Sequence, residues 1–121
     1  MFREILQEVV ENTDGGVAGL LMGFDGIPVE QFVKADANAD VDVETVGMEF
    51  SVILKSIRQA ADLLDAGTAR EVAIKAERMT TVIRMLNDEY FVAITLKPSG
   101  NLGKARFMLR TRSQKLLSDL T

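Results

Sequence analysis

Residues 69–97, AREVAIKAERMTTVIRMLNDEYFVAITLK, contain the strongest indication of the fold. Three runs in this stretch are rich in β-branched and aromatic residues and are typical of strands. These runs are residues 69–77, 79–87 and 90–97. The joints between them, Glu77-Arg78 and Asn87-Asp88-Glu89, are too short for a crossover connection, so they predict antiparallel hairpins.

The part of the chain before this stretch predicts one helix and two strands. Residues 2–12 place apolar side chains on one helical face. Residues 17–24 are almost all small or branched apolar residues, which suits a strand that is buried on both faces. Asp25-Gly26 is a hairpin signal before a second strand at 27–34. Pro28 lacks a backbone donor, so this strand is expected at a sheet edge or the proline at its start.

Two further helices complete the pattern. A polar loop at 35–41 leads into a long helix at 42–66, for which Gly67 is the expected C-cap. Asn101 is the expected N-cap of a last helix that runs to about residue 120. The order α-β-β-α-β-β-β-α predicts an α+β domain spanning residues 1–121, with a five-stranded antiparallel sheet and helices on its faces.

Composition excludes several classes of function. The chain has 121 residues, of which 47% are hydrophobic and 26% charged, as in ordinary globular proteins. It has no cysteine and no histidine, so the most common general base, thiol nucleophiles and zinc-thiolate sites are all missing. The net charge is −4, which argues against nucleic acid as the main partner. We expect neither an enzyme nor a cofactor.

Two motifs resemble ligand sites without completing them. Gly100-Asn-Leu-Gly-Lys104 is two residues short of a phosphate loop, and alanine follows the lysine where serine or threonine would hold magnesium. The acidic residues between Asp36 and Glu44 lack the spacing and the central glycine of a calcium loop. We interpret the first motif as a helix start and the second as a solvated loop, and expect no metal site.

The distribution of charge along the chain predicts a cytoplasmic protein that does not insert into a membrane. Residues 1–8 mix charged and apolar residues, unlike a signal peptide. The longest uncharged run, residues 15–24, is too short to span a bilayer.

The long helix carries apolar residues on two sides. One broad arc is expected to pack on the sheet, and it consists of Val43, Val46, Phe50, Ile53, Leu54, Ile57, Ala61 and Leu64. On nearly the opposite side, Met48, Val52 and Leu63 are interleaved with Lys55 and Gln59. Three apolar residues along one line of an exposed helix face favour a protein contact surface.

The strand after the long helix offers a second surface. Residues 70–77 alternate apolar side chains with mostly charged ones, so one face is expected to be buried. If this strand lies at a sheet edge, its free hydrogen-bonding ladder could pair with a second copy. The charged side chains of this strand could equally serve to prevent the edge from pairing with another chain.

Two motifs and the element order resemble the roadblock/dynein light chain family over essentially the whole chain. Residues 101–110, NLGKARFMLR, are similar to the family's Asn-x-Gly-x-x-Arg-x-x-(Leu/Met)-Arg helix start. Residues 19–29, GLLMGFDGIPV, are similar to its first hairpin. The resemblance implies that the long helix covers one face of the sheet and the terminal helices cover the other.

The resemblance also implies a function. Bacterial MglB-like single-domain members are homodimers that regulate small Ras-like GTPases, some of them as activators. By this likeness, the dimer interface would contain Leu63, Glu71, Val72, Ala73, Ile74 and Lys75. The surface facing the GTPase switch regions would contain Met48, Val52, Lys55, Arg58 and Gln59. Selection of one switch conformation would then favour hydrolysis.

Other mechanisms and functions stay open. An arginine finger is the alternative route to faster hydrolysis, and Arg58 and Arg84 are candidates by residue type only. A scaffold or motor-complex light chain would bind proteins without affecting a nucleotide cycle. A ligand-sensing domain is the least supported, because no polar cluster suits a buried ligand.

Overall fold

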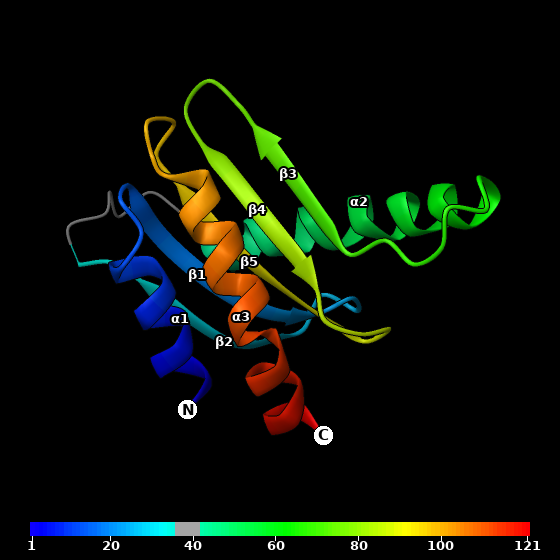
Figure 1. Ribbon diagram of the computed structural model, residues 1–121, viewed down its shortest axis with the longest axis horizontal. Helices are drawn as coiled ribbons and strands as arrows, with labels where there is room; N and C mark the ends of the chain where they lie inside the picture. The colour runs from blue at the N-terminus through cyan, green and yellow to red at the C-terminus, as the bar shows by residue number, and fades with distance from the viewer. Residues whose placement is uncertain (36–41) are drawn as a thin grey trace.

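Three helices and a five-stranded antiparallel sheet make up residues 1–35 and 42–121, which are the parts of the chain that the computed structural model describes (Figure 1). The elements are α1 (Phe2–Glu11), β1 (Gly16–Gly23), β2 (Pro28–Val33), α2 (Val43–Leu63), β3 (Glu71–Lys75), β4 (Thr80–Met85), β5 (Tyr90–Leu96) and α3 (Leu102–Leu120). Their order and the α+β class confirm the prediction. Apart from Ala35, the predicted polar loop lies outside the described residues.

The sheet has the strand order β2-β1-β5-β4-β3, and every neighbouring pair is antiparallel. β1 and β5 are therefore central, which explains why the apolar run at 17–24 is buried on both faces, as predicted. β2 is an edge strand and Pro28 is its first residue. The position that we predicted from the missing backbone N–H of Pro28 is therefore confirmed. β3 forms the other edge.

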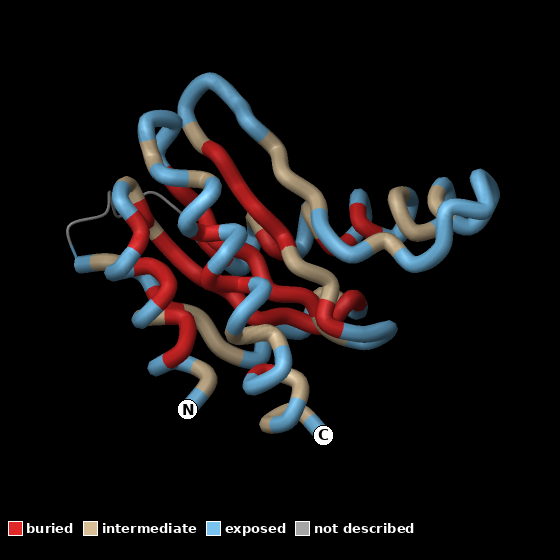
Figure 2. The backbone as a smooth tube through the Cα atoms, viewed as in Figure 1, coloured by how far each residue is buried: buried red, intermediate tan, exposed pale blue. Residues whose placement is uncertain are grey.

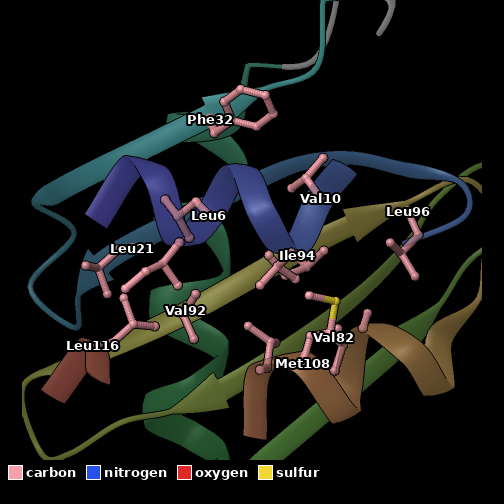
Figure 3. Packing of buried hydrophobic residues seen from close by; sticks show 14 of the residues in the cluster. Leu6, Val10, Leu21, Phe32, Val82, Val92, Ile94, Leu96, Met108 and Leu116 are labelled. Carbon is pink, nitrogen blue, oxygen red and sulfur yellow. The ribbon is translucent and has the colours of Figure 1, made fainter. Parts of the chain in front are cut away.

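The terminal helices α1 and α3 cover one face of the sheet (Figures 1 and 3). Leu6 on α1 and Leu109 and Leu116 on α3 are almost fully removed from solvent against Val92 and Ile94 of β5. These side chains form one continuous apolar core between two helices and the sheet.

α2 alone covers the opposite face (Figure 1). Leu54 of α2 packs there with Leu20, Met22 and Phe91 of the central strands. Gly47 lets the helix approach closely, because a Cβ atom at this position would lie 2.2 Å from Leu20 Cδ2. The first half of α2 is thus seated directly on β1.

The long helix ends earlier than predicted. Its last residue is Leu63, and the first left-handed residue that follows is Asp65 (φ 54°); Gly67 (φ 84°) is also left-handed but comes after the helix has ended. The N–H of Ala66 donates to the carbonyl of Ala61 at 2.9 Å, which is the long bond of a Schellman-type ending. Aspartate tolerates this conformation better than most residues, so it ends the helix before Gly67 is reached.

The start of α3 is as predicted. The side chain of Asn101 accepts a hydrogen bond from the N–H of Lys104 at 3.0 Å, as an N-cap does. The N–H of Asn101 itself donates to the carbonyl of Asp14 at 2.8 Å. The glycine-rich motif at 100–104 is therefore a helix start tied to the α1–β1 loop.

Candidate partner-binding surfaces

The two halves of α2 are in different environments. All its buried residues, Val43, Gly47, Ser51 and Leu54, lie in the first 12 positions of the helix. After Leu54 the helix continues past strand β3 and has only exposed and half-buried residues (Figures 1 and 2). A projecting amphipathic segment of this kind is a candidate contact surface.

The apolar arc predicted to pack on the sheet is only partly buried. Ile53 is 44% exposed and Leu64 is 78% exposed, so the prediction is wrong for both residues. The side of the helix that faces the sheet contains the small residues Gly47 and Ser51, which allow close packing. To one side of these two residues lies the apolar flank of α2, which we define as Phe50, Ile53, Ile57 and the C-cap residue Leu64.

A second apolar strip follows the outer side of α2. This outer line consists of Met48, Val52 and Leu63, and all three are exposed, Val52 by 63% and Leu63 by 87%. Lys55 and Gln59 are also exposed beside it. The predicted exposure is therefore confirmed, while the binding of a partner to these residues stays a prediction.

Arg58 lies away from the outer line. Its guanidinium carbon lies 4.5 Å from the centroid of the Phe24 ring, and its nitrogens donate to the backbone carbonyl of Asp88 at 3.2 Å and to its side chain at 3.3 Å. These contacts hold Arg58 against the end of the sheet. Arg84 is on β4, on the sheet face that α3 covers. Neither arginine lies beside Met48 and Val52.

The edge strand β3 contains the residues predicted for the dimer interface. In the described ranges, 1–35 and 42–121, it pairs with β4 alone, so its outer ladder is free. Val72 packs on the α2 side of the sheet, on the same core cluster as Ile57 of the apolar flank. On the other side, Glu71 forms an ion pair with Arg106 of α3 at 2.9 Å.

The described residues hold no cluster of three or more potential metal-binding His, Cys, Asp or Glu side chains. In the same parts of the chain, no helix is both long and apolar enough to cross a membrane. Hydrogen bonds from the hydroxyl and the backbone N–H of Thr45 lower the pKa of Asp42, which is the N-cap of α2. This shift has a structural cause, the capping of a helix.

Solved structures share this fold over nearly the whole chain. MglC from Myxococcus xanthus is 37% identical, with a TM-score of 0.69, and the match covers 98% of both chains. The gliding protein MglB from Thermus thermophilus is 19% identical, with a TM-score of 0.82, over 91% of this chain and 81% of that one. A roadblock/LC7 domain from Streptomyces avermitilis is 12% identical, with a TM-score of 0.85, over 98% of this chain and 96% of that one.

These matches define a roadblock fold, with α2 on one face of the sheet and α1 and α3 on the other. The chain belongs to the roadblock/dynein light chain family and is similar in sequence to MglC along almost its entire length. No family model and no curated protein sequence matches it.

Sequence reasoning missed Ile53 and Leu64 as surface residues, because it assigned them to the core. Phe50 and Ile57, by contrast, do pack against the core as predicted. The small residues Gly47 and Ser51 were the signal that could have located the sheet-facing side of the helix.

Proposed function

We propose that this chain is a non-catalytic, homodimeric regulator of a small Ras-like GTPase in the cytoplasm. The observation that carries the proposal is that α2 exposes apolar residues on two sides along its length, next to a free edge strand. Within the described residues of a single chain, no other segment covers these apolar side chains or the free edge of β3. Two protein contacts, one with a second copy and one with a GTPase, would cover them.

The edge strand and the apolar flank of α2 support the homodimer. Two β3 strands can pair through their free backbone groups, and side chains from Leu63 and from Glu71–Lys75 would line the contact. Ile53 and Leu64 would then be removed from water against the second copy. A related protein is described as MglB with a tetrameric arrangement, so self-association occurs in this fold.

The outer line of α2 supports the GTPase contact. Met48 and Val52 offer adaptable apolar area, and Lys55 and Gln59 beside them offer hydrogen-bond donors. A surface that binds one switch conformation more tightly than another shifts the GTPase toward that state. Arg58 is held by Phe24 and Asp88, so conformational selection is favoured over an arginine finger.

The experiment is single-turnover GTP hydrolysis by a small Ras-like GTPase from the same genome, with and without this protein. We expect an acceleration of at least about tenfold, equivalent to about 1.4 kcal/mol of barrier. Val52→Asp should abolish the effect, since it places a charge on the outer line. Phe107→Asp is the matched control, because Phe107 is an exposed apolar residue on α3, away from α2.

The arginine variants separate the mechanisms. Arg58→Ala and Arg84→Ala should keep the acceleration if they remain folded, as checked by circular dichroism. A near-complete loss in either folded variant would contradict conformational selection. Binding to the GTPase without any change in hydrolysis would identify a scaffold instead.

A further inference from the structure

An open depression of about 380 Å³ lies where α2, the α2–β3 connection, the end of β4 and α3 meet. Its lining is unusually rich in arginine: Arg58 comes from α2, Arg70 from the connection and Arg84 from β4. Asp88 is its one acidic lining residue among the described residues. Three arginines against one aspartate leave a surplus of two positive charges, on a chain whose net charge is −4.

The aspartate is already engaged by one arginine. Asp88 pairs with Arg58 at 3.3 Å. Asp62 lines a smaller adjoining hollow that also borders Arg58, so the acidic groups lie on the Arg58 side. The surplus positive charge therefore belongs to Arg70 and Arg84.

Arg84 does not form an ion pair with the acidic residue that lies opposite it on the neighbouring strand. Glu71 lies opposite it in the β3–β4 register, where an opposite charge would normally pair with it. The Glu71 carboxylate instead pairs with Arg106 of α3 at 2.9 Å. Across residues 1–35 and 42–121, neither Arg70 nor Arg84 forms an ion pair.

The other polar groups of the lining suit a bound oxyanion. Gln114 of α3 and Asn87 of the β4–β5 hairpin bring side-chain amides to the same depression, whereas the Ser113 hydroxyl already donates to the carbonyl of Arg110. Guanidinium groups bind carboxylates through two parallel hydrogen bonds, which are stronger than bonds between neutral groups. Neither of the apolar strips of α2 takes part, so this surface is distinct from the two described above.

We infer that this depression binds an acidic segment of a protein partner, with one carboxylate accepting hydrogen bonds from Arg70 and Arg84. A protein segment fits better than a small ligand, because the depression is open and Arg70 is exposed at its rim. The inference does not depend on GTPase regulation, since neither Arg70 nor Arg84 belongs to the outer line that is proposed to contact the GTPase.

The test is a titration of the full-length protein with a hexaglutamate peptide whose two ends are blocked, so that only side-chain carboxylates are present. We expect saturable shifts of the Arg70 and Arg84 Nε–H signals in NMR spectra. Arg70→Gln and Arg84→Gln should each weaken binding by at least about tenfold. Arg84→Lys should also weaken it severalfold, because lysine keeps the charge but loses the planar fork.

Arg110→Gln is the matched control, because Arg110 is an exposed arginine of α3 that lies over Phe107 outside the depression. It removes the same charge and should leave the affinity unchanged. An equal loss of affinity in Arg110→Gln would overturn the inference by showing attraction to net charge alone. A second titration with sodium phosphate at matched ionic strength distinguishes the source of the oxyanion. Saturation by phosphate at lower concentration than by peptide would overturn the protein segment as the occupant.

Discussion

The two faces of the sheet are covered to different extents. Two helices, α1 and α3, cover one face, where Leu6, Leu109 and Leu116 are almost fully buried (Figure 3). A single helix covers the other face, and only its first half is buried there. Ile53 and Leu64 stay exposed on that side. One face is therefore complete within a single chain, and the other is left with apolar groups that a second chain can cover.

Removing a large side chain from the complete face should have the largest effect on stability. Leu6→Ala would leave a cavity under α1, because Leu6 is fully buried among β-strand residues and α3. The expected loss in the free energy of unfolding is about 2–5 kcal/mol, measured by urea denaturation. Met48→Ala on the exposed outer line should change it by less than about 0.5 kcal/mol. Similar losses in both variants would show that the outer line is part of a core.

A charge on the projecting half of α2 should affect association and leave the fold unchanged. Leu63→Asp places a carboxylate at an 87% exposed position predicted to lie in the dimer interface. Self-association should weaken by about tenfold to a hundredfold, which corresponds to about 1.4–2.7 kcal/mol, as measured by sedimentation velocity. The circular dichroism spectrum should not change.

Phe107→Asp serves as the control for general effects of an added charge, since Phe107 is exposed on α3. A dimer that persists in Leu63→Asp at the wild-type concentration, or one that dissociates equally in Phe107→Asp, would contradict the proposed interface.

The close contact between α2 and β1 can be tested with a single methyl group. Gly47→Ala would place a Cβ within 2.2 Å of Leu20 Cδ2, so the Leu20 side chain must move. The packing strain, about 1–3 kcal/mol, is partly offset by the higher helix propensity of alanine, leaving a net loss of about 1 kcal/mol. Gly103→Ala in α3 is the matched helical control, because its Cβ would meet no atom closer than 3.6 Å. This control should be neutral or stabilising, and a loss as large as that of Gly47→Ala would exclude the packing explanation.

Most of the fold could be predicted from local patterns, because each element carries its own signal. The uninterrupted apolar run at 17–24 identified a central strand, and the short joints after residues 77 and 87 identified hairpins. Asn101 marked the start of α3 because a cap acts within one turn. Each of these signals depends only on residues that are close to one another in the sequence.

The candidate surfaces were harder to predict, because they depend on how elements approach each other. Helical periodicity identified the apolar arc of α2, but the side that touches the sheet is set by the close approach at Gly47. Arg58 was predicted to face the GTPase together with Met48 and Val52, yet Phe24 and Asp88, which are distant in sequence, hold it elsewhere. The depression around Arg70 and Arg84 has no local signal, since it forms only when β4, α3 and the α2–β3 connection meet.

The smallest expected effect concerns the two N-caps, one on each face of the sheet. Asp42 caps α2, and hydrogen bonds from Thr45 lower its pKa below the ordinary value of about 3.9. A depressed pKa in the folded state means that the cap stabilises fully above the unfolded-state value. This stabilisation is lost as the pH falls through the folded-state pKa. Asn101 caps α3 without titrating.

Asp42→Asn isolates this effect, because asparagine also caps helices well but carries no charge at any pH. The difference in the free energy of unfolding between the wild type and Asp42→Asn should be constant at neutral pH. It should shift against the wild type as the pH falls below about 4, since the titrations of all other groups cancel in the comparison. Amide hydrogen exchange at Thr45 should accelerate over the same pH range in the wild type relative to the variant. Parallel stability curves down to acid pH would show that the charge on Asp42 contributes nothing to the first turn of α2, and that both caps act through neutral hydrogen bonds alone.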